Sequence, residues 1–467
     1  MRSQSHRDMQ INPITVYQTV QKLIDEWRDL KETMSVTAMS DLLAGNISIP
    51  KAQDLEDVSN AIFRIQDVYE ISSIEIARGT VPGMEESGEL DAKTCFDLGN
   101  IAFDRQDYYH ALSWFQTALL RSLNERPPTL ERHELYPVLA LSMKKKNNTI
   151  RAQQLAILFD QTTTDREIFN RTLAKYPELA VLLEKLADID WMDNDFDDLP
   201  VITNDRLNWY EVAEQPRYES LCREEYQNEI SERGPRHCYY DQSTPYLSLS
   251  PAKVEELLDQ PLVLLYHQVI TDAEIKVLQD LAMDRMLHAT VISGPSNGGN
   301  TKSTVSRESL TGWLEDQDHP VVERVRKRVG ALTKLDIKYS EHLQVNLYGI
   351  GGHYRPHYDS LKRFTDDEKE IRAKLPENRI ATFMFYLDEP VLGGGTAFPL
   401  LDLVVKPSKH DALFWYNLRP SGNRDLKTLH AGCPVISGTK WVANQWIRVK
   451  GQELSRKCSL TIDQSAL

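Results

Sequence analysis

The segments 344–360, QVNLYGIGGHYRPHYDS, and 428–446, TLHAGCPVISGTKWVANQW, carry most of the information in this chain. Both are typical of strands in a compact β domain. Residues i and i+2 of a strand project from the same face, so His357 and Asp359 can point into one cavity. His430 then completes a set of two histidines and one carboxylate, which binds Fe(II) on one face and leaves other coordination positions open for substrate and O2. This pattern predicts oxygenase chemistry.

Lys440 follows His430 in a segment whose side chains alternate between two faces. The expected inward face carries Lys440, Val442, Asn444 and Trp446, and the opposite face carries Trp441, Ala443, Gln445 and Ile447. An inward lysine needs an anion. The co-substrate 2-oxoglutarate supplies one, because its keto acid end chelates iron while its distal carboxylate meets the ammonium in a charge-assisted hydrogen bond. The alternative is a chance His-x-Asp pair with a solvated lysine, and the later His-x9-Lys spacing favours the metal site.

Motifs spread over the second half of the chain resemble the catalytic domain of one family, the α subunit of collagen prolyl 4-hydroxylase. They are LSPAKVEELLDQP, HLQVNLYGIGGHYRPHYD, NRIATFMFYL, GGGTAFP, ALFWYNLRPSG, HAGCPVISGTKWVANQWI and GQELSRKC. The likeness extends over nearly the whole chain. It implies that His357, Asp359 and His430 are iron ligands, that Lys440 anchors 2-oxoglutarate, and that ascorbate rescues oxidised iron.

The activity implied by the resemblance is that of a procollagen-proline 4-dioxygenase. Such an enzyme hydroxylates peptidyl proline in X-Pro-Gly repeats with 2-oxoglutarate and O2, giving 4-hydroxyproline, succinate and CO2. Two alternatives stay open: a non-catalytic relative that binds proline-rich chains, and a 2-oxoglutarate oxygenase with another peptidyl substrate. The lysine at the anchor position and the helical repeat described below favour the prolyl enzyme.

The expected fold is multidomain α + β. Residues 1–85 form a helical N-terminal region, in which apolar stripes run from Val16 to Met34 and from Leu55 to Tyr69; the resemblance implies dimerisation there. Residues 86–180 form a tetratricopeptide-like domain and 181–245 an acidic linker, whose DIDWMDNDFDD run lacks the glycine and glutamate of a calcium loop. Residues 246–467 form a double-stranded β-helix, or jelly-roll, with helices near 272–283 and 319–332.

The tetratricopeptide-like domain contains one clear repeat. Its signature residues are Leu98, Gly99, Asp107, Tyr108, Ala111, Phe115 and Ala118, and the next repeat keeps only Leu139, Ala140 and Ala152. The resemblance implies a peptide-substrate groove that binds polyproline II chains. We expect Asp107, Tyr108, Tyr109 and Tyr136 to line it. The alternative is that Tyr108, Tyr109 and Trp114 only pack between helices.

The chain has five cysteines, and the family resemblance implies that they lie in an oxidising compartment. The family implies that Cys222 pairs with Cys238 and that Cys433 pairs with Cys458, which leaves Cys95 over. Five reduced cysteines in a cytosolic enzyme are the alternative from composition. Three possible glycosylation sites begin at Asn46, Asn147 and Asn170.

The start, MRSQSHRDMQINPITVY, has no apolar signal region, and no apolar run is long enough to span a membrane. We therefore expect a chain without its true N-terminus, located by resemblance in the endoplasmic reticulum lumen. The family implies an α2β2 tetramer with protein disulfide isomerase as the β subunit. The net charge of −15 argues against nucleic-acid binding.

Other polar residues of the catalytic region carry weaker signals. His353 is expected in the pocket wall or behind the ligands, because the proline and glycines around it exclude a helical metal site. The glycines 393–395 are expected to form a tight turn. His342 and His410 have no partners at ligand spacing, and 366–374 is expected to be a surface loop over the site.

Overall fold

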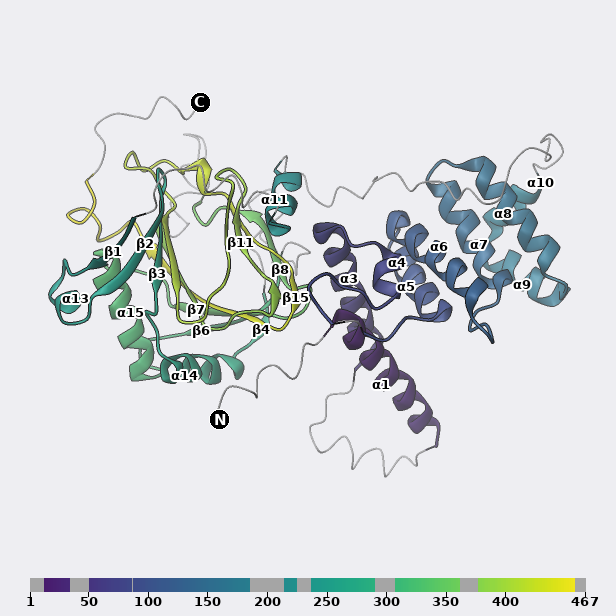
Figure 1. Cartoon of the computed structure of the whole chain (residues 1–467), viewed down its shortest axis with the longest axis horizontal. Coiled ribbons are helices and arrows are strands. Elements are labelled where there is room, and N and C mark those ends of the chain that lie inside the picture. Colours follow the sequence, from purple (N-terminus) through teal and green to yellow (C-terminus); the bar gives the residue numbers. More distant parts are fainter. Residues whose placement is uncertain are drawn as a thin grey trace. The chain divides into compact units, whose positions relative to one another are not determined.

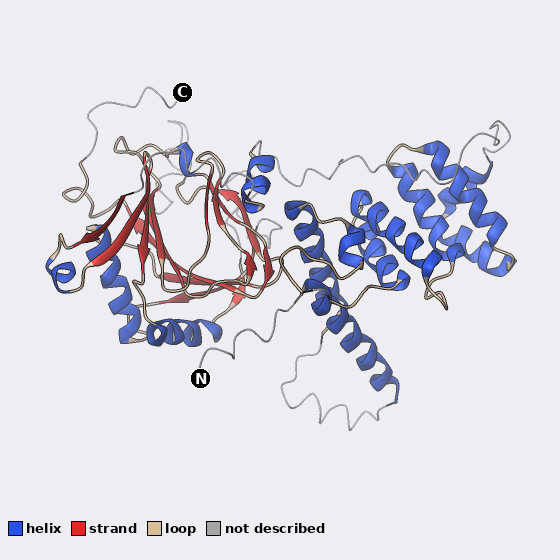
Figure 2. Ribbon diagram, viewed as in Figure 1, coloured by secondary structure: helices blue, strands red, loops and turns tan. Residues whose placement is uncertain are grey.

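The computed structural model of this chain describes two units, which are treated separately below (Figures 1 and 2). The described residues are 12–33, 50–85, 87–184, 214–224, 237–289, 307–361 and 377–457. Those up to 184 form a helical unit and those from 214 onward form a unit built around β-sheets. Within these ranges no helix is both long enough and apolar enough to cross a membrane.

The helical unit begins with α1 (Pro13–Thr33), α3 (Ala52–Tyr69) and the short α4 (Ser73–Ala77). Pro13 occupies the first turn of α1, where its missing N–H costs nothing. The first turns of α1 are buried, at Ile14 and Tyr17, whereas Leu23 and Leu30 further along are more than two-fifths exposed. Helix α3 buries one apolar side, as its stripe predicted.

Six further helices follow as packed pairs. They are α5 (Ala92–Asp104), α6 (Tyr108–Asn124), α7 (Arg132–Lys145), α8 (Thr149–Thr162), α9 (Arg166–Lys175) and α10 (Pro177–Glu184). Gly99 lets α5 and α6 approach, because a Cβ atom there would lie 2.4 Å from a ring carbon of Phe115. Leu139, Ala140 and Ala152, the few repeat residues that the second repeat keeps, are buried between α7 and α8. The predicted tetratricopeptide-like arrangement is therefore confirmed.

Two antiparallel sheets face each other in the second unit. The larger sheet has the order β1 (His237–Asp241), β2 (Ala252–Asp259), β3 (Leu262–His267), β13 (Ala412–Tyr416), β9 (Arg379–Tyr386), β16 (Lys440–Arg448), β7 (Leu343–Tyr348), β6 (Leu310–Leu314), β4 (Leu287–His288). The smaller sheet has the order β12 (Leu403–Val405), β11 (Thr396–Phe398), β14 (His430–Gly432), β8 (His353–His357), β5 (Arg307–Glu308). A separate pair joins β10 (Leu392–Gly393) to β15 (Val435–Ser437). This is the predicted jelly-roll arrangement.

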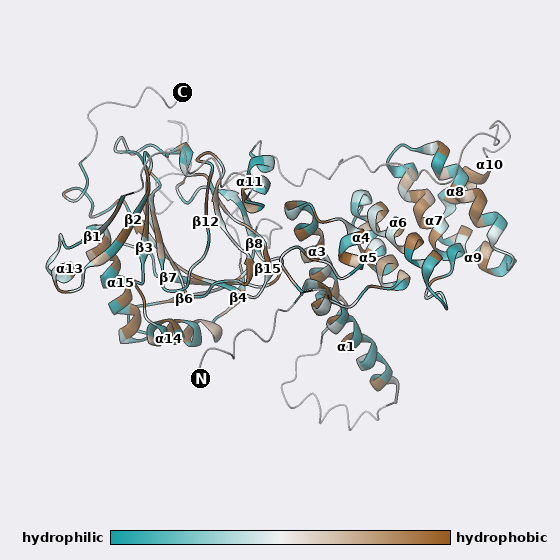
Figure 3. Ribbon diagram, in the orientation of Figure 1, coloured by the Kyte–Doolittle hydropathy of each residue, from teal (hydrophilic) through white to brown (hydrophobic). Residues whose placement is uncertain are grey.

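Side-chain alternation divides the core of this unit into two layers. Phe383 and Phe385 of β9 pack toward α14 (Asp272–Met283) and α15 (Pro320–Thr333), which cover the outer face of the large sheet. Met384 and Tyr386 point the other way, into the space between the sheets. Figure 3 shows hydrophobic residues recurring along both helices. Both helices lie where the sequence predicted them, and the alternation of β16 has the predicted phase.

The disulfide pairing expected from the resemblance is wrong in this structure. Cys222, at the end of α11 (Gln215–Cys222), is bonded to Cys433, which directly follows β14. Cys238 on β1 is exposed and free, and Cys95 is free and buried in α5. Cys458 lies outside the described residues, but Cys433 is not available to it. The physical reason is that α11 packs against β11 and β12, which brings residue 222 beside β14.

The segment expected to be a linker contributes structure to the β unit. Helix α11 is held to the smaller sheet by the disulfide and by an ion pair between Arg217 and Asp402. Strand β1 is paired along its length with β2, and α13 (Pro245–Leu249) follows it. The acidic run 188–198 itself lies outside the described residues. The four domain limits remain predictions.

Candidate active site

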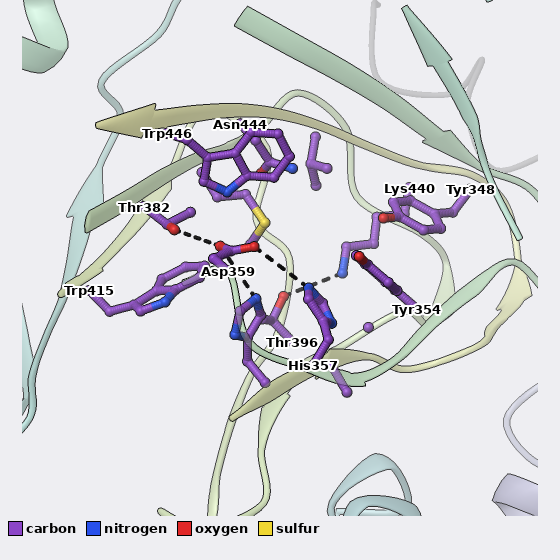
Figure 4. Close-up of a pocket in the computed structure, with 15 residues that line it drawn as sticks. Tyr348, Tyr354, His357, Asp359, Thr382, Thr396, Trp415, Lys440, Asn444 and Trp446 are labelled. Atoms are coloured by element: carbon purple, nitrogen blue, oxygen red, sulfur yellow. Dashed lines mark hydrogen bonds and ion pairs between the residues drawn. The ribbon is translucent and has the colours of Figure 1, made fainter. Parts of the chain in front are cut away.

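Two histidines and one aspartate meet at the inner side of the smaller sheet (Figure 4). His357 ends β8 and His430 begins β14, and the two residues are directly opposite each other in the strand register. Asp359 follows two residues after His357. Its carboxylate oxygens lie 3.7 Å from Nε2 of His357 and 3.6 Å from Nε2 of His430. One potential ligand atom from each residue lies within 4.8 Å of the others, so the three can hold one metal ion.

Backbone carbonyls orient both imidazole rings. The Nδ1 atom of His357 donates to the carbonyl of Arg355 at 2.7 Å, and Nδ1 of His430 donates to the carbonyl of Thr428 at 3.0 Å. A carbonyl can only accept, so each Nδ1 carries a hydrogen, and in the neutral imidazole Nε2 then keeps the lone pair. Hydrogen bonds of this kind hold the rings of metal-binding histidines in place. Both lone pairs face Asp359.

The electrostatics keep His357 and Asp359 in their metal-binding forms at neutral pH. Burial, with the neighbouring His430, lowers the pKa of His357 to about 3, so its imidazole is neutral. Burial alone would raise the pKa of the Asp359 carboxyl, but the two imidazoles, Arg379 and the Thr382 hydroxyl lower it to about 2. A neutral imidazole and an ionised carboxylate are the forms that bind metal ions.

Lys440 begins β16 and points into the same pocket from the larger sheet (Figure 4). It is 4% exposed, and its ammonium makes one hydrogen bond, to Oγ1 of Thr396 at 3.3 Å. The rings of Tyr348 and Tyr386 lie about 6 Å from it (5.8 and 5.9 Å). Among the described residues no acidic side chain pairs with it, and burial lowers its pKa to about 7. An anion bound beside this lysine would stabilise its charged form, and no described acidic side chain supplies one.

The pocket between the sheets has a volume of about 430 Å³, including its open mouth. The metal-binding cluster and Lys440 line it together with Tyr348, Tyr354, Thr382, Met384, Thr396, Trp415, Ala431, Gly432, Val442, Asn444 and Trp446. Tyr354 stacks on His357 with ring centroids 3.5 Å apart. Three buried polar atoms of the lining have no protein partner in the described part of the chain: Asn444 Oδ1, Trp415 Nε1 and Trp446 Nε1. The pocket is therefore built to receive polar ligands.

The donor set suits Fe(II) with 2-oxoglutarate. Two imidazoles and one carboxylate form the set that non-haem Fe(II) oxygenases use, with coordination positions left open. A closed structural zinc site would need a fourth protein ligand, and the described residues offer three. The unpaired Lys440 ammonium fits the distal carboxylate of a dicarboxylic co-substrate bound in the same pocket.

Gly394 lies between β10 and β11, beside the Lys440 side chain. Its φ of +71° is the left-handed backbone conformation that glycine adopts at little cost. A Cβ atom there would lie 2.8 Å from Pro390 and 3.5 Å from the Lys440 side chain. The predicted tight turn at 393–395 is wrong: Gly393 ends β10, and Gly394 and Gly395 continue as a connection to β11 that contains no turn. The reason is cross-strand pairing, because the Gly394 N–H donates to the Pro434 carbonyl and the Gly395 carbonyl accepts from the Cys433 N–H.

The remaining histidines of the catalytic region lie outside the cluster. His353 on β8 is 1% exposed and does not line the pocket. His410 pairs with Asp272 at 3.0 Å, and His342 is not among the possible metal ligands of the described residues. The loop 366–374 lies outside the described residues. The sequence did not identify Thr382, Asn417 or Thr396, because a hydroxyl or amide within an apolar strand pattern has no characteristic spacing.

The residues expected in a peptide groove have mixed surroundings. Asp107 is buried: it caps α6 through the backbone N–H of His110 and contacts the His110 ring at 2.7 Å. Tyr108 and Tyr109 on α6 are half-buried, and Tyr136 on α7 is 7% exposed. Trp114 is fully buried and donates to Gln66 at 2.9 Å, so it packs between helices. The groove remains a prediction for the tyrosines.

Family models match the chain in three successive segments. Residues 343–448 match the 2OG-Fe(II) oxygenase superfamily, so the chain is a 2-oxoglutarate-dependent Fe(II) dioxygenase in class. Residues 92–183 match the prolyl 4-hydroxylase peptide-substrate-binding domain, and residues 2–83 match the prolyl 4-hydroxylase alpha-subunit N-terminal region. These segments contain the metal-binding cluster with Lys440, the repeat helices and helix α1.

Curated relatives extend this match to nearly the whole chain. Prolyl 4-hydroxylase subunit alpha-2 of Caenorhabditis elegans is 36% identical over 458 residues, 96% of this chain and 82% of that protein. Subunit alpha-1 of Bos taurus is 34% identical over 459 residues, 96% of this chain and 85% of that protein. The chain belongs to the family of prolyl 4-hydroxylase alpha subunits.

A solved structure of viral collagen prolyl hydroxylase, from Paramecium Bursaria Chlorella virus-1 with 2OG, is 30% identical. The match covers 40% of this chain and 95% of the viral chain, with a TM-score of 0.32.

Proposed function

We propose that this chain hydroxylates C4 of peptidyl proline in X-Pro-Gly sequences, using 2-oxoglutarate and O2 and releasing succinate and CO2. The observation that carries the proposal is the buried His357–Asp359–His430 cluster in one pocket with a buried Lys440 that has no acidic partner among the described residues. The names of the relatives in the preceding section support proline as the target. Collagen-like chains supply this residue in every X-Pro-Gly repeat.

His357, Asp359 and His430 hold Fe(II) in this proposal. Their two lone pairs and one ionised carboxylate are already directed at a common point, which reduces the cost of assembling the site on binding. Lys440 binds the distal carboxylate of 2-oxoglutarate, with the Thr396 hydroxyl beside the ammonium. When bound, Fe(II), 2-oxoglutarate and O2 supply the oxidising power that replaces a C–H bond of proline by C–OH.

The residues of this chain contribute position and shielding. Carbonyl groups fix the two imidazoles, and the stacked Tyr354 ring covers one side of His357. Between the two sheets, apolar side chains such as Met384, Trp415 and Val442 limit the access of water to the reacting atoms. Exclusion of water protects a reactive intermediate from side reactions.

The helical unit binds the proline-rich substrate chain in this proposal. Tyr108 and Tyr109 are the best-placed contacts among the four residues named from the sequence, because both remain partly exposed on α6. Asp107 acts by capping α6 beneath them, and Tyr136 contributes from α7. Flat aromatic rings suit the apolar faces of proline in a polyproline II chain.

The assembly and the location also follow from the family. The relatives are named as subunits, and we propose protein disulfide isomerase as the β subunit of an α2β2 tetramer in the endoplasmic reticulum lumen, with ascorbate as reductant of oxidised iron. The Cys222–Cys433 disulfide supports an oxidising compartment. Asn147 and Asn170 are exposed, as acceptors of glycans would be.

One assay separates this proposal from the alternatives. The full chain is incubated with Fe(II), 2-oxoglutarate, ascorbate and a (Pro-Pro-Gly) peptide, beside a peptide in which lysine replaces the hydroxylated proline. We expect 4-hydroxyproline, identified by mass and by amino-acid analysis, in the first peptide alone. Oxidation of the lysine peptide would indicate another oxygenase, and binding of the first peptide without oxidation would indicate a non-catalytic relative.

A further inference from the structure

Thr382 on β9 lines the pocket and contacts the carboxylate of the metal-binding cluster (Figure 4). Its hydroxyl donates to Oδ2 of Asp359 at 2.6 Å, a length typical of a charge-assisted O–H···O⁻ hydrogen bond. Both residues are buried: Thr382 is 1% exposed and Asp359 is 8% exposed. The bond is therefore shielded from competition by water.

Asn417 orients the hydroxyl that donates this hydrogen bond. Asn417 directly follows β13 and is 1% exposed, and its Nδ2 donates to Oγ1 of Thr382 at 2.9 Å. An amide NH2 group has no lone pair to offer, so the hydroxyl accepts from Asn417 and its single proton must go to Asp359. The loop around Asn417 is itself tied down, because its backbone N–H donates to the carbonyl of Ile380 and its carbonyl accepts from Asp425.

The consequence concerns how many oxygens of Asp359 an iron ion can use. A six-coordinate iron with two imidazoles needs a carboxylate that occupies one position, because 2-oxoglutarate takes two positions and O2 takes one. A carboxylate that binds through both oxygens would occupy a position that the co-substrates need. The Thr382 proton engages Oδ2, the oxygen 3.6 Å from Nε2 of His430, and leaves Oδ1, 3.7 Å from Nε2 of His357, without this bond. It thereby disfavours binding through both oxygens.

We propose that Thr382, oriented by Asn417, is a positioning residue that limits Asp359 to binding iron through one oxygen and so keeps the co-substrate positions open. This inference rests on the proposed roles of iron and 2-oxoglutarate. A purely structural role for the same hydroxyl, that of a satisfied buried group, would affect stability but would not change the number of open positions.

The test measures binding rather than turnover. Mn(II) is titrated into the metal-free full chain, and 2-oxoglutarate is then titrated into the Mn(II)-loaded protein, both by calorimetry. In Thr382→Val we expect 2-oxoglutarate affinity to fall by roughly ten-fold or more, the size of effect typical for loss of an outer-shell partner. Mn(II) affinity should stay within a few-fold, because the freed Oδ2 would then bind the metal itself. The visible charge-transfer absorption of the anaerobic Fe(II)–2-oxoglutarate complex should weaken in parallel.

Three further variants keep the test decisive. Thr382→Ser retains the hydroxyl and should restore 2-oxoglutarate affinity. Asn417→Ala keeps the Thr382 hydroxyl but removes the amide that orients it. Its loss of 2-oxoglutarate affinity should therefore be smaller than that of Thr382→Val. Thr333→Val is the matched control, because it removes a buried threonine hydroxyl that bonds the Val329 carbonyl on α15, away from the pocket. It should bind both ligands as the wild type does.

The outcomes separate this inference from the proposed function. Wild-type protein that binds Mn(II) but not 2-oxoglutarate would overturn both. Wild-type protein that binds both, with Thr382→Val indistinguishable from it, would overturn the positioning role alone. The same holds if Thr382→Val loses Mn(II) and 2-oxoglutarate in equal measure, because the hydroxyl would then support the whole cluster. If Thr382→Val does not fold, Asn417→Ala decides the question with the same two titrations.

Discussion

At the residue scale, burial acts on two charges of one pocket with different results. Asp359 remains strongly ionised because two imidazoles, Thr382 and Arg379 face it. Lys440 has no acidic partner among the described residues, and burial lowers its pKa to about 7. The contrast indicates that groups of the protein stabilise the charge of Asp359, whereas the charge of Lys440 is left for a ligand to stabilise.

Removal of the Lys440 ammonium should raise the requirement for 2-oxoglutarate. We expect Lys440→Ala to cost roughly 2–5 kcal/mol of co-substrate binding, the usual range for one partner of a buried charge pair. Metal binding should stay nearly intact, because Lys440 does not contact the cluster. Calorimetric titration of 2-oxoglutarate into the Mn(II)-loaded variant measures this. Unchanged affinity would show that another residue anchors the co-substrate.

The lowered pKa of Lys440 predicts a pH dependence of 2-oxoglutarate binding. A carboxylate partner stabilises the ammonium, so the lysine pKa is about 7 in the free protein and higher in the complex. Below pH 7 the lysine is already protonated and affinity should be flat. Above pH 7 binding must take up a proton, and affinity should fall by up to about ten-fold per pH unit.

The matched control for this pH dependence is Lys440→Arg. A guanidinium stays protonated throughout this range, so its co-substrate affinity should not fall between pH 7 and 9. Calorimetry in buffers of different ionisation enthalpy would count the protons taken up. Equal pH profiles for the lysine and arginine proteins would contradict the assignment of this titration to Lys440.

At the element scale, the side-chain periodicity of the sequence predicted the orientation of β16 and the positions of two helices. The alternation in β16 placed Lys440, Val442, Asn444 and Trp446 on the pocket side, and two helices were predicted almost to the residue. Side-chain period is a local property, so it can be read from one segment. His430 lies opposite His357 because of strand order, which motif likeness rather than local pattern supplied.

What the sequence did not predict depends on contacts between distant segments. The partner of Cys222 is decided by where α11 packs, and spacing contains no information on that. Thr382 and Asn417 meet only because β9 and β13 are neighbours in the large sheet. Within the peptide region, local pattern could not distinguish a buried tryptophan, Trp114, from an exposed aromatic contact.

The disulfide predicts a specific weakness of the smaller sheet. Cys222→Ser frees α11 from the residue that follows β14, and removal of a native disulfide typically costs 2–5 kcal/mol. We therefore expect a lower unfolding temperature and weaker Mn(II) binding, because β14 begins with His430. Cys238→Ser, which removes a free exposed thiol, should change neither.

Peptide mapping without reduction tests the pairing itself. It should recover a cross-linked peptide that contains Cys222 and Cys433. Recovery of Cys222 linked to Cys238 would contradict the structure and would restore the pairing implied by the family resemblance.

At the scale of the whole molecule, a substrate-binding unit and a catalytic unit share one chain. Their division of labour predicts how substrate length affects activity. Every residue of helix α7 from Leu135 to Met143 is buried, so the helix presents no exposed tyrosine beyond the slightly accessible Tyr136. Each aromatic contact with proline contributes about 0.5–1.5 kcal/mol beyond its area.

This chain should therefore prefer long (Pro-Pro-Gly) peptides over short ones less strongly than a relative with more exposed tyrosines. Losing two such contacts would weaken binding by about one to two powers of ten. The measurement is the ratio of KM values for a long and a short peptide, with Tyr108→Ala as the variant that should reduce the ratio further. Equal ratios for this chain and a tyrosine-rich relative would show that other residues build the groove.

The central claim is that His357, Asp359, His430 and Lys440 form the site at which proline hydroxylation is coupled to 2-oxoglutarate decarboxylation. The most direct measurement is the fate of labelled oxygen. The full chain is supplied with 18O2, Fe(II), 2-oxoglutarate, ascorbate and a (Pro-Pro-Gly) peptide, and both products are analysed by mass. His430→Ala is the inactive control, and His410→Asn, which tolerates the positive φ at that position, is the active one.

The account predicts that one atom of each O2 molecule appears in succinate and the other in 4-hydroxyproline, in equal amounts, for the wild type and His410→Asn. His430→Ala should yield neither product. Labelled succinate without labelled peptide, or hydroxyproline formation that survives His430→Ala, would contradict it.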